Sequence, residues 1–268
     1  MLPSESDYRR FSFGAKPYKK IHEIANRPGS ILVIPVGSVE QHGHHLPVAT
    51  DSLLVSAVTN AAVDRVADDL PILVTPTIWT GHSPHHRGFG GTLSIPFDTM
   101  KQMVIDLADS ALDNDFDSIL LVNGHGGNKA LISAVLGEIG REHPNVETAG
   151  FTYFELAADA IGELRESTQS GMAHAGEYET SLLMYLLDEF VIESEFEDTY
   201  YVDNYEHVGV DLLDGGPMSV YRSFTQYSDS GAVGDSTLAS ADKGERIFEL
   251  VTDEYEAILR SLHEHTAD

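Results

Sequence analysis

The sequence contains no cysteine in its 268 residues. Disulfide bonds and thiolate metal ligands are therefore excluded. A metal ion would have to be held by histidine, aspartate, glutamate or water.

Basic residues are also scarce. Lysine and arginine together number 16 against 43 aspartates and glutamates, which gives a formal net charge of −27. The acidic residues are scattered along the whole chain, so we expect them to cover solvated faces, as in proteins from a halophilic host. Binding of a basic partner is the alternative. Nucleic acid is not expected as a partner, because phosphate contacts need a basic patch and we find none.

Long apolar runs are missing as well. No run approaches the roughly 20 residues needed to cross a membrane, so no membrane partner is expected. The N-terminal segment MLPSESDYRRF lacks the charged and apolar regions of a signal peptide. We therefore expect a soluble, cytoplasmic protein. With 42% hydrophobic residues the chain can build a sizeable core, and we predict one domain over residues 1–268.

Predicted strands alternate with predicted helices along the chain. Apolar runs and β-branched residues predict strands at residues 31–36, 72–75, 119–122 and 146–153. Helical spacing predicts helices at residues 16–27, 52–70, 97–113, 129–141 and 239–263, and another after His174. Residues 192–238 carry too weak a pattern for a prediction. This alternation favours a mainly parallel sheet with helices on both faces.

A dense group of polar side chains follows the first predicted strand, in the stretch ILVIPVGSVEQHGHHLPVATD at residues 31–51. Glu40 and His42 are two residues apart, so in an extended segment they leave from the same face and can converge on one ion. Asp51 closes the stretch, and in open α/β sheets the site lies beyond the carboxyl ends of the strands. The alternative is a polar loop whose carboxylates cap the next helix. We expect the neighbouring His44 and His45 to be loop or supporting residues.

Two later segments offer further ligands at equivalent places. NGHGGN, residues 123–128, carries His125, and HAGEYETS, residues 174–181, carries His174, Glu177 and Glu179. A parallel sheet brings such loops together along one edge. Histidine and carboxylate donors without sulfur suit Zn, Mn, Fe or Co in a hydrolytic site, where the ion acidifies water and polarises a carbonyl. One or two ions could be bound, and Asp51 is the natural candidate to bridge them.

Other roles for these residues stay open. The loop around His125 could hold a phosphate at a helix N-terminus, although it lacks the lysine and Ser/Thr pair of a P-loop. Acidic residues in a first helical turn are favoured by the helix dipole whether or not they bind metal. Asn123 and Asn128 are expected to brace the turn by side-chain to backbone hydrogen bonds. The candidate substrate-binding residues are His86, from the long loop 76–96, together with Asn123 and Gly126.

The three segments together resemble a known family. PVGSVEQHGHHLPVATD resembles the signature of the creatininase family of metal-dependent amidohydrolases, and NGHGGN and HAGEYETS resemble its second and third motifs. Their order and spacing fit over roughly residues 20–260. The resemblance implies a three-layer α/β/α fold, a homo-oligomer that is often hexameric, and hydrolysis of a carbon–nitrogen amide bond of a small molecule at a divalent metal centre.

The resemblance also implies roles for individual residues. Glu40, His42, Asp51 and His125 match positions that bind metal in the family, with Asp51 bridging two ions. His174 matches a histidine beside the reacting group, so we expect His174 or Glu179 to deliver a proton to the leaving nitrogen.

Two positions depart from the creatininase pattern. Gly127 stands where creatininase has a metal-binding glutamate, and Ala173 stands where it has an acidic residue. These departures argue against creatinine as the substrate, and we predict that Glu177 supplies the missing ligand. Branches with the present motifs include an archaeal deformylase of a formylaminopyrimidine nucleotide in flavin and deazaflavin biosynthesis, and a peptidase that trims the mycofactocin precursor. The acidic composition favours the archaeal enzyme. Outside enzymes, the chain could be a divalent-cation binding module or a nucleotide-binding domain.

Overall fold

A four-stranded sheet forms the centre of the molecule. The computed structural model describes residues 10–201, 205, 207–209, 211–213 and 216–267. The strand order is β2-β1-β3-β4, and each neighbouring pair is parallel. The strands are β1 (Ile31–Val36), β2 (Ile72–Val74), β3 (Ser118–Asn123) and β4 (Glu147–Thr152). Every residue of β1, β2 and β3 is buried, as expected for strands covered on both faces.

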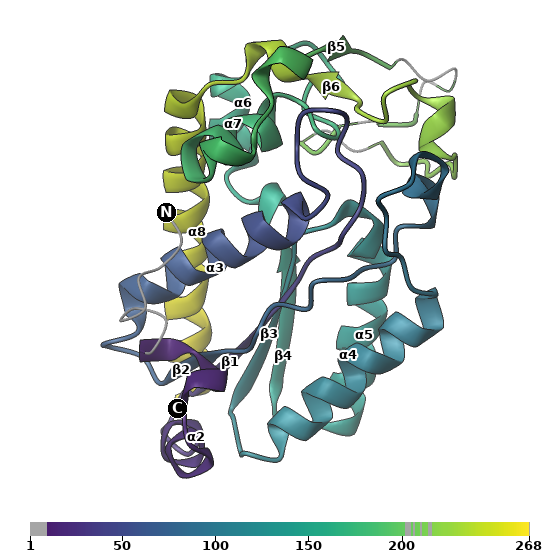
Figure 1. Cartoon of the computed structure of the whole chain (residues 1–268). Coiled ribbons are helices and arrows are strands. Elements are labelled where there is room, and N and C mark those ends of the chain that lie inside the picture. Colours follow the sequence, from purple (N-terminus) through teal and green to yellow (C-terminus); the bar gives the residue numbers. More distant parts are fainter. Residues whose placement is uncertain (1–9, 202–204, 206, 210, 214–215, 268) are drawn as a thin grey trace.

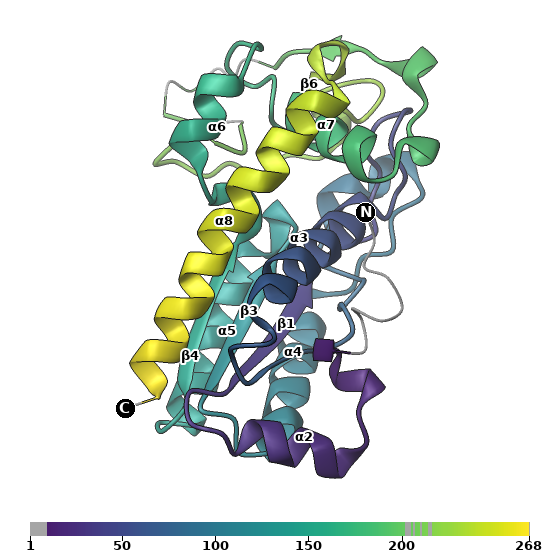
Figure 2. The same cartoon turned by 90° about the vertical axis from the view of Figure 1, so that its left-hand side faces the viewer.

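Helices cover both faces of this sheet. Alternate residues of β1 point to opposite sides: Ile31 and Val33 join the core with α3 and α8, whereas Leu32 and Ile34 join the core with α4 and α5. Figure 1 shows the sheet nearly edge-on between these two helical layers, and Figure 2 shows α8 and α3 in front of it. The predicted three-layer α/β/α fold is confirmed. The helices are α2 (Tyr18–Ala25), α3 (Thr50–Val66), α4 (Phe97–Leu112), α5 (Lys129–Glu142), α6 (Ala158–Leu164), α7 (Glu177–Leu186) and α8 (Ala241–Thr266).

The segments that carry the predicted site residues gather beyond the carboxyl ends of the strands. There, at the top of Figure 1, the loop after β1 approaches α7 and a small antiparallel pair formed by β5 (Asp198–Thr199) and β6 (Gly234–Asp235). The backbone of His174 pairs with that of Val233, next to β6. The 3-10 turn Gly126–Asn128 follows β3 at the same edge. The fold thus brings the three polar segments to one rim of the sheet.

The start of α3 differs from the prediction by two residues, with a consequence for Asp51. The helix begins at Thr50, so Asp51 lies inside its first turn and is only 2% exposed. A carboxylate is favoured there by the helix dipole. The apolar face of α3, with Leu54, Val55 and Val58, packs into the core and fixes the direction in which Asp51 enters the rim.

Two sequence expectations concern the chain ends and membranes. Of the N-terminal segment that lacks signal-peptide features, residues 1–9 lie outside the described residues. Among the residues that are described, no helix combines the length and the apolar character needed to cross a membrane.

Candidate metal centre

Glu40, Asp51 and His125 form one half of a buried cluster. The Nδ1 atom of His125 lies 3.0 Å from Glu40 Oε2 and 3.1 Å from Asp51 Oδ2. All three side chains are at most 3% exposed. One atom of each lies within 4.8 Å of the other two, so the three could hold a single ion.

His42, Asp51 and Glu179 form the other half. His42 Nε2 lies 3.2 Å from Asp51 Oδ1 and 3.8 Å from Glu179 Oε1. These atoms also lie close enough together to hold one ion. Asp51 belongs to both halves, because one of its oxygens faces His42 and the other faces His125.

Two buried atoms of the cluster lack hydrogen-bond partners in the part of the chain that the structure describes, as expected of atoms that bind a metal ion. Both His42 Nε2 and Asp51 Oδ2 are fully buried and have no hydrogen-bond partner among the described residues. Their neighbours are near but not aligned to donate or accept. Buried polar atoms are seldom left in this state unless an ion or a water satisfies them.

Hydrogen bonds on the side away from the cluster orient the side chains of His42 and Glu179. The Nδ1 atom of His42 lies 3.0 Å from the carbonyl oxygen of Glu40, so an Nδ1 proton would leave Nε2 bare toward the cluster. Glu179 Oε2 accepts a hydrogen bond of 2.6 Å from the backbone amide of Ala175, which turns Oε1 inward. Ala175 has a positive φ of 52°, a strained conformation for a non-glycine residue and one common at functional sites.

The cluster is electrostatically suited to positive charge. Burial alone would lower the pKa of His42, but the carboxylates of Asp51 and Glu179 raise it well above its usual value. Burial would likewise lower the pKa of His125, yet Glu40 and Asp51 raise it to about 10. Burial would raise the pKa of Asp51, but the two histidines keep it well below its usual range. The carboxylates therefore stabilise a cation between them, whether a proton or a metal ion.

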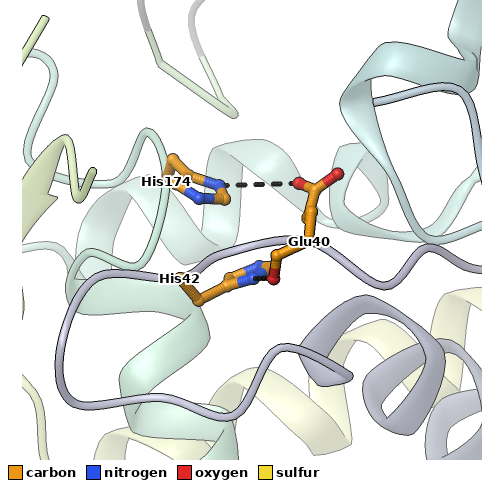
Figure 3. A group of neighbouring side chains, drawn as sticks. All are labelled: Glu40, His42 and His174. Carbon is orange, nitrogen blue, oxygen red and sulfur yellow. Dashed lines mark hydrogen bonds and ion pairs between the residues drawn. The ribbon is translucent and has the colours of Figure 1, made fainter. Parts of the chain in front are cut away.

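His174 and His86 line the next layer, on the Glu40 side. His174 Nδ1 lies 3.9 Å from Glu40 Oε1, and Figure 3 shows the ring facing that carboxylate. His86 Nε2 lies 3.2 Å from the same oxygen. Burial first, and then the charge of other histidines, lowers the pKa of both rings well below the usual value, so both are neutral at neutral pH. The structure thus places His86 beside the cluster, and its contact with substrate stays a prediction.

Glu177 does not lie at the cluster. Its carboxylate is fully buried, forms an ion pair with Lys243, and accepts hydrogen bonds from the amides of Glu166 at 3.0 Å and Ser167 at 2.9 Å. The geometry therefore contradicts the predicted ligand role of Glu177. Glu179, predicted to be a proton donor, lies at the cluster instead, in a group that could hold an ion.

Three other predicted residues have different surroundings. Asn123 braces the loop as expected: it donates to the carbonyl of His125 at 2.8 Å and accepts from the His125 amide at 3.1 Å. Asn128 accepts from the His82 amide and donates to the Gly37 carbonyl, which ties two loops together. Asn123 also donates to the hydroxyl of Thr152 at 3.1 Å, so both hydrogens of its side-chain amide are used within the protein. Gly126 is exposed at the start of the turn.

Several site residues were missed by sequence reasoning. The side-chain nitrogen Nε2 of Gln41 lies 2.7 Å from His86 Nδ1, and the backbone carbonyl oxygen of Gln41 lies 2.7 Å from His174 Nε2. The ring of Phe224 packs at a tilt against that of His86, with ring centroids 4.0 Å apart, and comes from a segment whose sequence pattern is too weak for a prediction. Gln41 directly follows Glu40 in the first motif, and this position could have identified it as a candidate site residue. His45, expected to be a supporting residue, is buried and lies 3.0 Å from the Thr180 hydroxyl, while His44 is exposed.

A three-layer α/β/α fold with a histidine and carboxylate cluster beyond the strand ends is compatible with a hydrolase that binds a divalent metal ion. The sequence model of the creatininase family, described as creatinine amidohydrolase, matches residues 18–259. The chain therefore belongs to the creatininase family of amidohydrolases.

Individual relatives differ in their named substrates. The chain is 30% identical over 237 residues to the mycofactocin precursor peptide peptidase of Mycolicibacterium smegmatis, which covers 88% of this chain and 85% of that protein. It is 27% identical over 258 residues to the 3-dehydro-scyllo-inosose hydrolase of Thermotoga maritima, covering 87% and 78%. A solved structure titled "Creatininase Mn" superposes with a TM-score of 0.80 at 24% identity, covering 93% of this chain and 97% of that one. This last likeness supports the fold.

Proposed function

We propose that this protein hydrolyses a carbon–nitrogen amide bond with the help of two divalent metal ions. The observation that carries the proposal is the position of Asp51, whose two oxygens face two different histidines in a buried cluster lined by carboxylates. Glu40, Asp51 and His125 would hold one ion, and His42, Asp51 and Glu179 the other. The donor set, without sulfur, suits Zn, Mn or Fe.

The ions would supply an acidified water and polarise the substrate carbonyl. The remaining chemistry falls to His174. Because the Gln41 carbonyl lies 2.7 Å from His174 Nε2, an Nε2 proton is held there and Nδ1 is left to accept a proton or to return it to the leaving nitrogen. Phe224 and His86 cover the same side of the cluster and limit the access of water.

The substrate is proposed only by class, as a small-molecule amide. A peptide amide is a second candidate, because the similarity to the mycofactocin precursor peptide peptidase extends over most of both chains. We also propose that the protein acts in the cytoplasm as a homo-oligomer. Light scattering after gel filtration would test the oligomeric state. A screen of creatinine, formylated pyrimidines and short peptides with metal-loaded protein would separate the substrate candidates.

Asp51→Asn tests the proposal directly. The change removes the shared charge while keeping the shape, so metal content should fall by at least one ion per chain and amide hydrolysis by at least about a hundredfold. Asp64→Asn, on the exposed side of the same helix, is the matched control and should leave both unchanged. Elemental analysis and turnover of the screened substrate provide the readouts.

Two results would contradict the proposal. One is hydrolysis that survives complete removal of metal by a chelator. The other is an Asp51→Asn variant that keeps its metal and its activity. Metal uptake by the unchanged protein without turnover of any amide would favour a cation-binding module instead.

A further inference from the structure

A short chain of buried hydroxyl groups connects His125 to Glu40 behind the cluster. His125 Nε2 lies 3.1 Å from Ser83 Oγ, which lies 2.6 Å from Ser38 Oγ. Ser38 Oγ in turn donates to Glu40 Oε2 at 3.0 Å. Both serines are 0% exposed, so bulk water does not compete for these hydrogen bonds.

The two ends of the chain fix the direction of every hydrogen bond in it. In the form that binds a metal ion Glu40 is ionised and can only accept, so Ser38 donates to it. Ser38 must then accept from Ser83, and Ser83 must accept from His125. His125 therefore carries a proton on Nε2.

This proton position matters for the cluster. With this proton on Nε2, Nδ1 is the nitrogen that faces Glu40 and Asp51, 3.0 and 3.1 Å away, and it can bind a metal ion that takes the place of its second proton. The opposite tautomer would aim an N–H group into the site and leave Ser83 without a donor. Metal-binding histidines commonly depend on such a partner on the other ring nitrogen.

We propose that Ser83 and Ser38 are positioning residues that hold His125 and Glu40 together in the form that binds the metal ion. This inference rests on the metal centre of the proposed function. Ser83 reaches the site from the long loop after β2, because Asn128 accepts from the amide of His82 beside it. The relay thus ties the loop after β1, the loop after β2 and the turn after β3 into one unit.

A second acceptor for His125 is present but weaker. The carbonyl oxygen of His82 lies 3.4 Å from His125 Nε2, at the outer limit of a hydrogen bond. Removal of Ser83 would leave His125 this long contact alone, and Ser38 would lose the donor that helps to fix its hydroxyl on Glu40. The loss should therefore be large but not complete.

Mn²⁺ affinity, measured by competition with a chelator on the full chain, tests the proposal. Ser83→Ala and Ser38→Ala should each weaken Mn²⁺ binding by about 10- to 100-fold. Ser118→Ala is the matched control, because Ser118 is also fully buried and hydrogen-bonded but lies at the far end of β3. It should leave the Mn²⁺ affinity within about twofold, whatever it does to stability.

The double variant separates a relay from simple packing. If the serines act through one chain, removal of either breaks it, and Ser38→Ala with Ser83→Ala should bind Mn²⁺ within about threefold of the weaker single variant. Independent packing effects would multiply the two losses and overturn the relay. If Ser83→Ala does not fold, Ser38→Ala against Ser118→Ala gives the same comparison.

The remaining outcomes are distinguishable from failure of the proposed function. Unchanged Mn²⁺ affinity in both single variants would overturn the relay and leave the metal centre standing. Absence of Mn²⁺ and Zn²⁺ uptake by the unchanged protein would overturn the metal centre, and the relay with it.

Discussion

Two glutamates of α7 have different tasks because of the geometry of a helix. Residues two positions apart on an α-helix point about 200° away from each other. Glu179 faces His42 across the cluster, so Glu177 must point away from it, toward Lys243 at the start of α8. A substitution at one should therefore have little in common with a substitution at the other.

The pair gives a clear prediction. Glu179→Gln should lower metal content and activity with little loss of stability. Glu177→Gln should keep the metal and lower the free energy of unfolding by about 2 kcal/mol, because it removes the buried carboxylate partner of Lys243 and leaves the exposed Glu166 as its ion-pair partner. Urea unfolding and elemental analysis measure the two effects. Glu155→Gln, which breaks the exposed pair with Lys129, is the control and should cost at most about 0.5 kcal/mol. Loss of metal in Glu177→Gln would contradict this division of roles.

The same substitution should alter the dependence of stability on pH. Burial would raise the pKa of Glu177, but Lys243 and the donors of Ser167 and Glu166 lower it below the ordinary 4.5. A carboxyl whose pKa is lower in the folded state stabilises the fold above its unfolded pKa, and this contribution disappears as the pH falls through the folded pKa. Below about pH 5, the native protein should therefore lose stability more steeply than Glu177→Gln.

At the scale of elements, the turn after β3 leaves no space for a side chain at position 127. A Cβ atom on Gly127 would collide with His125 Nε2 and would lie 2.8 Å from His85 Cε1. The ring of His85 stacks on that of His125, with an interplanar angle of 9°, and covers this position. The space that a glutamate at position 127 would need, as in the creatininase pattern, is therefore already filled in this protein.

Gly127→Ala should accordingly displace His125. We expect Mn²⁺ affinity to fall by at least about tenfold, because the histidine loses its alignment with Glu40. Gly126→Ala is the matched control, since a Cβ atom there meets nothing within 4 Å, and it should bind Mn²⁺ normally. Chelator competition compares the two variants. Equal affinities would mean that the turn adapts without moving His125.

The elements themselves were largely predictable, and the site was predictable in part. The apolar runs 31–36 and 119–122 predict β1 and β3 to within one residue, because strands buried on both faces need unbroken apolar sequence. The orientation of α7 was not predictable, because packing against α8 sets it, and this decides between Glu177 and Glu179. Ser83 was equally hidden, because its place depends on the contact between Asn128 and a distant loop.

At the scale of the whole molecule, the net charge of −27 should govern stability. The two hydrophobic cores lie on opposite faces of one sheet. We predict from the sequence that residues 1–268 form one domain, and this stays a prediction. Many acidic side chains, Glu193 and Glu195 among them, are exposed, and at this net charge they repel one another in dilute salt. The composition predicts a halophilic host, and the high salt concentration of such a host would screen this repulsion.

Salt should therefore stabilise the protein. Raising KCl from about 0.1 M to 1 M shortens the Debye length from about 10 Å to 3 Å and screens the repulsion, so Tm should rise by roughly 5 °C or more. Calorimetry at several KCl concentrations measures the effect, and sucrose at matched osmolality is the control for uncharged exclusion. Replacing the exposed Glu193 and Glu195 with lysine should make Tm less dependent on salt. A Tm that is constant or falls across this range would mean that the acidic surface is not under electrostatic strain.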